Sequence, residues 1–174
     1  GGSVPTLTYQ VSGWKYDDAQ KVPSQPAGIS GLKLWLDATD SSSISASSNT
    51  VSQWNDKSGN GQNLTASGDP QTGTRSLNNR NVVDFDGSGD YFQSANAYAS
   101  GNNFSILMVA GIDAIDHAND SLFSIRGEDP SFQLAADGSS EYKFKFNTTG
   151  MGSNQIFSTT ARHGPSIYEL VFND

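Results

Sequence analysis

The sequence predicts an all-β sandwich, and three observations lead to this fold class. Hydrophobic residues make up 34% of the 174 residues and charged residues 16%, while 18 residues are glycine. Short alternating or apolar stretches recur roughly every 8 to 12 residues, with turns of Gly, Ser, Asn and Asp between them. DAIDHAND, residues 113–120, fits one helical turn and no more. This combination is typical of antiparallel sandwiches with short strands.

Residues 1–30 differ in character from the rest of the chain. A short alternating stretch, LTYQVSGW, precedes KYDDAQKVPSQPAG, whose two prolines disfavour regular structure. We interpret residues 1–30 as an extended N-terminal arm or linker and residues 31–174 as the sandwich domain. An N-terminal strand belonging to the same domain explains the alternating stretch equally well.

The first half of the predicted domain holds strands separated by polar loops. LKLWLDA, residues 32–38, places Leu32, Leu34 and Leu36 on one side, which predicts a strand with one core face. The polar run 39–50 is expected to be a loop, VSQWND a strand and DKSGNGQN a turn. NLTAS, NVVDFDG and DYFQSA are predicted strands, with a Gly/Pro/Thr loop after NLTAS.

The second half is predicted to carry the centre of the core. FSILMVAGI, residues 104–112, is too short for a membrane span and fits a strand buried on both faces. EYKFKFN, residues 141–147, alternates aromatic and charged residues and predicts an antiparallel strand with one face on the core. The remaining strand candidates are SLFSIRG, SFQLAAD, QIFSTT and SIYELVFN.

The charge balance excludes two classes of partner. The chain has 10 basic and 18 acidic residues, which gives a net charge of −8. A negative surface repels phosphate backbones and anionic lipids, so we expect neither nucleic acid nor membrane as a partner. No run of 18 apolar residues predicts a transmembrane helix. The absence of cysteine excludes disulfides, thiolate metal sites and cysteine nucleophiles.

Four segments carry a family resemblance. GLKLWLDATD, VSQWNDKSGNGQNLT, NVVDFDGSGDYFQSA and NNFSILMVAGI follow one another in this order within residues 31–147. Together they resemble laminin-G-like domains of the concanavalin A-like lectin/glucanase superfamily. The similarity is greatest to the bacterial and phage versions, in which a W-D-x-SGNGN turn precedes an FDGSxDY hairpin.

The resemblance implies a two-sheet antiparallel jelly roll that binds glycans or surface proteins, displayed in an extracellular, cell-surface or virion setting. Such domains commonly bind Ca²⁺ in loops at a sandwich edge. They usually continue with further strands, so the final SIYELVFND is expected to be followed by more of the sandwich or to be completed by a partner. Because an unpaired strand recruits another chain, we also expect a homo-oligomer or a virion assembly.

The sequence does not favour catalysis, although the superfamily includes glucanases and lyases. Retaining glycoside hydrolysis needs two carboxyl groups roughly 5 to 5.5 Å apart. Glu128, Glu141 and Glu169 each stand alone, and the only same-strand carboxylate pair is Asp84 with Asp86. This pair ends a predicted hairpin rather than lining a groove of tryptophans. We therefore expect no enzyme, and a polysaccharide-cleaving activity is the least favoured hypothesis.

The DFDGSGD segment is the main metal candidate, because Ca²⁺ takes six to eight oxygen ligands and this segment is rich in Asp and Ser. The twelfth position counted from Asp84, where an EF-hand needs Glu, is Ala95, and this excludes an EF-hand. A different Ca²⁺ site would form if this turn met the DKSGNG turn. Its predicted ligands are Asp56, Asn60, Asp86 and Asp90.

The same segment has a purely structural interpretation, which the sequence favours. Asp and Asn side chains bond their own backbone in turns, and Gly87 and Gly89 supply the positive φ that a hairpin between NVVDFD and DYFQSA needs. For ligand binding, aromatic residues of the arm and polar or aromatic residues of this hairpin are the candidates. They are Trp14, Tyr16, Asp86, Asp90 and Tyr91.

The sequence therefore leads to a non-catalytic interaction module that binds glycan or protein partners for adhesion, with Ca²⁺ ordering its loops. The alternative is a structural virion component, a decoration or fibre protein that assembles through its N-terminal arm and C-terminal edge.

Overall fold

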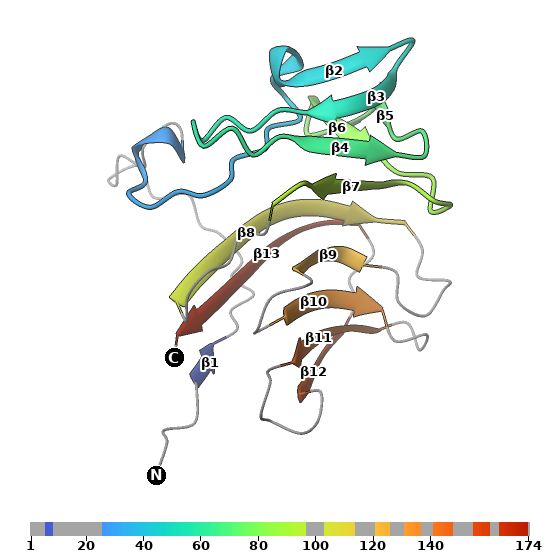
Figure 1. The fold of residues 1–174 in the computed structure, drawn as a ribbon. Coiled ribbons are helices and arrows are strands. Elements are labelled where there is room, and N and C mark those ends of the chain that lie inside the picture. Colours follow the sequence, from blue (N-terminus) through green and yellow to red (C-terminus); the bar gives the residue numbers. More distant parts are fainter. Residues whose placement is uncertain are drawn as a thin grey trace. The chain divides into compact units, whose positions relative to one another are not determined.

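The computed structural model describes residues 6–8, 26–96, 103–113, 121–125, 131–136, 141–147, 155–160 and 164–173. Every strand pairing among them is antiparallel. Their helical content is confined to two short 3₁₀ turns, η1 (Pro26–Gly28) and η2 (Ser41–Ser43). The predicted all-β class is confirmed (Figure 1). No helix within the described ranges is long and apolar enough to cross a membrane.

The chain divides into two compact units. One comprises Tyr16–Tyr98, and the other combines Gly1–Lys15 with Ala99–Asp174. The predicted arm contributes β1 (Thr6–Thr8), which pairs with β13 (Gly164–Asn173) in the second of these units. The predicted boundary between arm and domain at residue 30 stays a prediction.

The Tyr16–Tyr98 unit contains one six-stranded sheet. Its order is β6-β5-β3-β4-β7, and β2, which lies off this path, also pairs with β3. The strands are β2 (Ile44–Ser47), β3 (Thr50–Trp54), β4 (Leu64–Ser67), β5 (Gln71–Leu77), β6 (Arg80–Asp84) and β7 (Tyr91–Ser94). The predicted strands around β3, β4, β6 and β7 are confirmed.

Strands β2 and β5 lie in segments expected to be loops, and both belong to tight hairpins. Ser48 and Asn49 join β2 to β3 with φ of 49° and 73°, and Asn78 and Asn79 join β5 to β6 with φ of 49° and 59°. Two consecutive positive φ values are the hallmark of the type I′ turn, whose twist matches that of paired strands. These turns use Ser and Asn instead of the Asn-Gly signal, so the polar strands beside them escaped prediction.

This unit contains two fully buried residues and a cluster of aromatic rings. Val51 and Pro70 are fully buried, and the Val51 N–H donates to the Pro70 carbonyl at 2.8 Å. Trp54 on β3 and Phe92 on β7 meet edge to face at 5.6 Å between ring centroids, and Phe85 packs on Phe92 in the same manner at 5.8 Å. Such edge-to-face pairs are favourable beyond the area they bury.

The predicted strand at residues 32–38 was wrong. These residues join no sheet. The Trp35 N–H donates to the Asp56 carboxylate at 3.0 Å, and the Trp35 carbonyl accepts from the Lys57 N–H at 2.8 Å. Because groups of the DKSGNG turn satisfy this backbone, the segment is held without a neighbouring strand.

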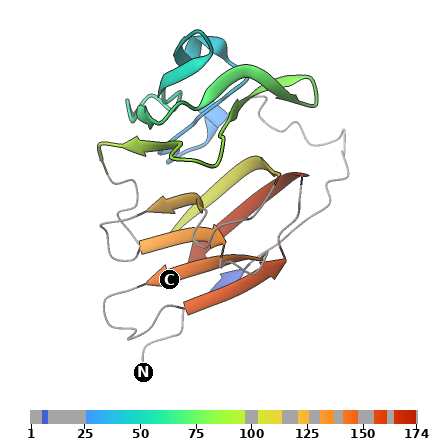
Figure 2. The same ribbon diagram turned by 90° about the vertical axis from the view of Figure 1, so that its right-hand side faces the viewer.

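The other unit contains two described sheets. The first has the order β1-β13-β8, where β8 spans Asn103–Ile112. The second has the order β12-β11-β10-β9 (Figure 2). Its strands are β9 (Ser121–Ile125), β10 (Ser131–Ala136), β11 (Glu141–Asn147) and β12 (Gln155–Thr160). The predicted strands of the second half, EYKFKFN included, are confirmed.

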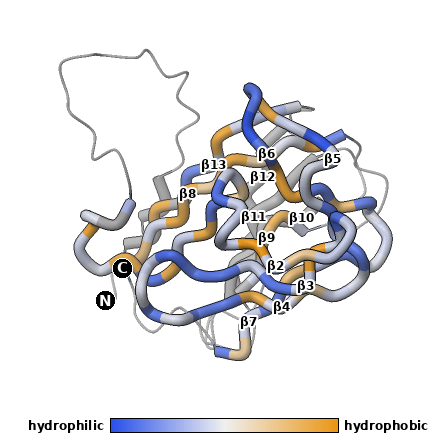
Figure 3. Tube along the Cα trace, turned by 90° about the horizontal axis from the view of Figure 1, so that it is seen from above, coloured by the Kyte–Doolittle hydropathy of each residue, from blue (hydrophilic) through white to orange (hydrophobic). Residues whose placement is uncertain are grey.

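The expectation that FSILMVAGI is buried on both faces was wrong. Along β8, exposed residues alternate with partly buried ones, ending in the buried Ile112. Leu107 and Val109 are 68% and 63% exposed, and Val109 lies opposite Ile167 of β13, which is also exposed. Figure 3 shows hydrophobic residues along these strands, so the alternation of β8 is one of exposure and not of hydropathy. An antiparallel strand with two unlike faces replaces the predicted doubly buried one.

Candidate functional site

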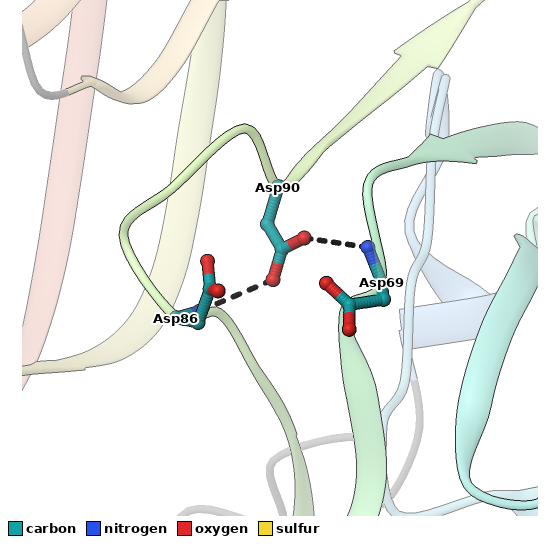
Figure 4. A group of neighbouring side chains, drawn as sticks. All are labelled: Asp69, Asp86 and Asp90. Atoms are coloured by element: carbon teal, nitrogen blue, oxygen red, sulfur yellow. Dashed lines mark hydrogen bonds between the residues drawn. The ribbon is translucent and has the colours of Figure 1, made fainter.

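Three carboxylates gather in the Tyr16–Tyr98 unit. Asp69 lies in the loop between β4 and β5, and Asp86 and Asp90 lie in the turn between β6 and β7. One carboxylate oxygen from each residue lies within 4.8 Å of the others (Figure 4). Asp90 is partly buried, and Asp69 and Asp86 are exposed. We call these three residues the acidic group.

Asp90 connects the two loops that form the acidic group. Its Oδ1 accepts from the Asp69 N–H at 2.7 Å, and its Oδ2 accepts from the Asp86 N–H at 3.1 Å (Figure 4). Asp86 in turn accepts from the Ser88 N–H at 2.6 Å, which closes a local Asx turn. The predicted turn role of these aspartates is therefore present, and the same bonds orient the carboxylates of Asp86 and Asp90.

Gly68 makes the approach of the two loops feasible. Its φ is +75°, and a Cβ at this position would collide with Oδ1 of Asp90 and lie 2.9 Å from the Gly89 carbonyl oxygen. Glycine is the residue that combines a left-handed backbone with such a close contact. The position of Asp69 beside Asp90 thus depends on the residue that precedes it.

Aromatic side chains flank the acidic turn. Phe85 follows the end of β6 and is 46% exposed, and Tyr91 begins β7 and is 50% exposed. Exposed rings beside polar loops are typical of ligand-contacting surfaces, because a ring offers a large rigid area at low entropic cost.

A second polar network is centred on Asp56. Its carboxylate accepts four hydrogen bonds, from the backbone N–H groups of Trp35, Ser58 and Gln62 and from the Ser58 hydroxyl, at 2.7 to 3.1 Å. Burial raises the pKa of Asp56, but these donors outweigh burial and hold the pKa below its ordinary value. Asp56 therefore acts as an anionic centre around which the DKSGNG turn folds.

Asn60 connects the same turn to residues 32–33 by hydrogen bonds. Its side-chain amide donates to the carbonyls of Leu32 and Lys33 at 2.8 and 3.1 Å, and to the Ser58 hydroxyl at 2.9 Å. The Ser58 hydroxyl, whose proton is donated to Asp56, also lies 3.3 Å from the Lys33 carbonyl oxygen. Together with Asp56, these side chains provide the contacts that a sheet neighbour would otherwise provide.

Lys57 forms ion pairs with two aspartates next to this network. Its ammonium lies 2.9 Å from Asp37 and 2.7 Å from Asp40, and 4.4 Å from the centroid of the Trp35 ring. Hydrogen bonds from Lys57 and Ser42 lower the pKa of Asp40 to about 2. Burial raises the pKa of Asp37, but hydrogen bonds from Thr39 and Lys57 outweigh it and leave the pKa below its ordinary value.

We expect the Tyr16–Tyr98 unit to lose stability in acid. The pKa values of Asp37, Asp40 and Asp56 are lowered in the folded state, so their contribution is complete above the ordinary value of 3.8. It is lost as the pH falls towards about 2, where Asp40 protonates. Thermal unfolding measured between pH 3.8 and about pH 2 checks the expected loss of stability.

A Lys57→Met variant is the control for the acid prediction. Without the ammonium, the pKa of Asp40 moves back towards its ordinary value, and the variant should lose less stability than the parent over this pH interval. If the stability of the variant depended on pH in the same way as that of the parent, Lys57 would not be the cause of the loss of stability in acid.

The structure brings together only part of the predicted metal site. Asp86 and Asp90 meet, but the third carboxylate is Asp69, which the sequence analysis left in a loop without a role. Asp56 and Asn60 are not part of the acidic group: both are engaged with the backbone of residues 32–35, a partner that the sequence analysis had placed in a strand. A signal for Asp69 existed in its Gly-Asp-Pro context, which marks a turn.

The remaining residues named in the sequence analysis are the aromatic ligand candidates and Asp84. Tyr91 is exposed beside Asp90, as a ligand contact requires. Trp14 and Tyr16 lie outside the described residues. Asp84, the other member of the same-strand carboxylate pair, forms an ion pair with Arg75 at 3.0 Å, while Asp86 belongs to the acidic group.

Comparisons of the chain with protein-family models, with curated proteins and with solved structures found no match.

Proposed function

We propose that this chain is a non-catalytic interaction module that binds glycan or protein partners at a cell or virus-particle surface. Its fold would be a two-sheet antiparallel β-sandwich of the laminin-G-like, concanavalin A-like type. One observation carries the proposal: three carboxylates from two loops converge within 4.8 Å, and the residues that adjoin Asp86 and Asp90 in the sequence, Phe85 and Tyr91, are exposed. The antiparallel all-β architecture supports it.

Ca²⁺ suits the acidic group because all of its donors are carboxylate oxygens, the ligands that this hard cation prefers. The salt bridges within the described part of the chain involve other aspartates, so the negative charges of the group have no lysine or arginine partner there. Asp69, Asp86 and Asp90 would hold the ion. Each carboxylate oxygen has a second lone pair, so the backbone bonds to Asp90 are compatible with this role.

A bound cation would also explain how a shallow surface selects a ligand. Three carboxylates do not fill the six to eight positions that Ca²⁺ takes, and ligand hydroxyls would complete the shell. Phe85 and Tyr91 would contact the apolar face of a sugar ring or a side chain of a protein partner. The module would then bind through the ion and the rings together.

We expect Asp86→Asn to weaken Ca²⁺ binding by about tenfold or more, because it removes one of three anionic ligands. Asp86 accepts only the Ser88 N–H in the structure, so the variant should remain folded. Calorimetric titration with Ca²⁺ measures the change.

The matched control is Asp84→Asn in the same hairpin, which removes a carboxylate outside the acidic group and should leave the affinity unchanged. A glycan array with and without a chelator then tests the ligand. Equal Ca²⁺ affinity of Asp86→Asn and the parent would refute the metal site. An array without any bound glycan would refute the glycan form of the proposal.

A further inference from the structure

Asn60 and Gly61 form the kind of dipeptide in which asparagine is chemically least stable. In this reaction the backbone nitrogen of the following residue attacks the side-chain amide, and glycine hinders the attack least because it has no side chain. Both residues are exposed. Gly61 has a φ of +69° and no atom within 4 Å of the place of a Cβ, so solvent reaches the dipeptide.

The folded structure restrains the group that would react. The Asn60 amide nitrogen donates to the carbonyls of Leu32 and Lys33 and to the Ser58 hydroxyl. The Asn60 backbone N–H donates to the same hydroxyl at 3.2 Å. An amide held by three acceptors cannot turn its carbonyl carbon towards the Gly61 nitrogen without giving up these bonds. Reaction therefore requires the DKSGNG turn to release residues 32 and 33.

We propose that Asn60 is a deamidation site gated by the docking of residues 32–33 onto the DKSGNG turn. Solvent hydroxide removes the Gly61 N–H proton, the nitrogen bonds to Cγ of Asn60, and the Cγ–Nδ2 bond breaks with loss of ammonia. Water then opens the resulting succinimide, leaving aspartate or isoaspartate at position 60. No oxidant, reductant or further reactant is required.

The product cannot re-form the docked structure. The amide of Asn60 is a donor at all three of its contacts, whereas an ionised carboxylate is only an acceptor. It would face two carbonyl oxygens, and the negative charge would lie in the same turn as the Asp56 carboxylate. Each deamidation of Asn60 thus releases residues 32–33 from the DKSGNG turn irreversibly. This inference does not depend on the acidic group or on the proposed function.

The first test is the rate of deamidation, followed by peptide mapping with mass spectrometry at mildly alkaline pH. Deamidation takes far longer than local opening, so the rate follows the population of the open turn. Ser58→Ala removes an acceptor of Asn60 and a hydroxyl donor to Asp56 in the same turn, and should raise the rate at Asn60 about tenfold.

The control is Ser52→Ala, which removes an exposed serine hydroxyl bonded to Ser45 and should leave the rate at Asn60 unchanged. In concentrated urea, parent and both variants should react equally fast and faster than the native parent. Equal rates in native and urea-unfolded parent would overturn the gate, and so would a native rate that Ser58→Ala does not change.

The second test examines the consequence without waiting for the reaction. Asn60→Asp should increase hydrogen exchange at the Trp35 N–H at least tenfold, because release of residues 32–33 loosens the adjoining bond to Asp56. Asn63→Asp provides the comparison, since Asn63 contacts the turn through an oxygen that Asp retains. It should leave exchange at Trp35 near the parent value. Unchanged exchange in Asn60→Asp would contradict the proposed outcome of deamidation.

Discussion

Gly68→Ala is expected to destabilise the Tyr16–Tyr98 unit by about 3 kcal/mol or more. A non-glycine residue at a φ of +75° is strained, and the new Cβ would collide with the Asp90 carboxylate. Its other neighbours, the Gly89 carbonyl oxygen at 2.9 Å and the Asp90 Cα at 3.0 Å, are backbone atoms that cannot move aside cheaply. The loops must therefore separate, which breaks the bond between the Asp69 N–H and the Asp90 carboxylate. Urea denaturation measures the loss of stability.

Gly87→Ala separates backbone strain from the collision of the new Cβ as causes of the lost stability. Gly87 has a similar φ of +80°, but no atom lies within 4 Å of the place of its Cβ. This variant should lose only the roughly 1 to 2 kcal/mol of backbone strain and keep the acidic group assembled. Calcium titration of both variants gives a second measurement: the proposed binding should disappear in Gly68→Ala and persist in Gly87→Ala. Equal destabilisation by the two substitutions would show that the loop contact at Gly68 contributes nothing.

Asp56→Asn is expected to destabilise the same unit by about 3 kcal/mol. The carboxylate accepts four hydrogen bonds, and each bond to a charged acceptor contributes more than a neutral one. An asparagine retains one acceptor oxygen, and its amide nitrogen would confront donors that it cannot satisfy. For a unit of this size, the melting temperature should fall on the order of 10 °C or more. Hydrogen exchange at the Trp35 N–H should lose its protection at the same time.

Asp84→Asn is the matched control for this change. Asp84 forms a single ion pair with Arg75, whose side chain is 52% exposed. Exposed pairs of this kind contribute about 0 to 1 kcal/mol, so the substitution should shift the melting temperature little. A comparable shift in both variants would mean that Asp56 is not the organising residue of its turn.

Strand positions were predictable wherever side-chain alternation was strong. EYKFKFN became β11, because a strand with unlike faces has a period of two that is visible locally. The polar strand β5 lacks this period, and β2 shows it over four residues only. Their existence rests on the turns at Ser48–Asn49 and Asn78–Asn79, where residues other than glycine adopt positive φ. The sequence analysis reserved that role for glycine and therefore expected loops.

The apolar run of β8 shows that burial is harder to predict from the sequence than strand position. A continuous run of hydrophobic residues is compatible with burial on both faces or on one, and composition alone does not separate the two. The structure places Leu107 and Val109 on an exposed face and Ile112 in the interior. Which face is covered depends on what packs against the sheet, not on the residues of β8 themselves.

The sequence by itself determined the all-β class, most strand positions and the turn that carries Asp86 and Asp90, because alternation and glycine-rich turns act over a few neighbouring residues. Tertiary structure alone decided which groups these turns contact. Asp69 and Asp90 are 21 residues apart, and so are Trp35 and Asp56. Such contacts form only when distant loops approach each other. The approach of the loop at Asp69 to the turn at Asp90 requires a residue without a side chain at position 68. The structure has two separate networks, one around Asp90 and one around Asp56, in place of the meeting of the two turns that the alternative metal hypothesis required.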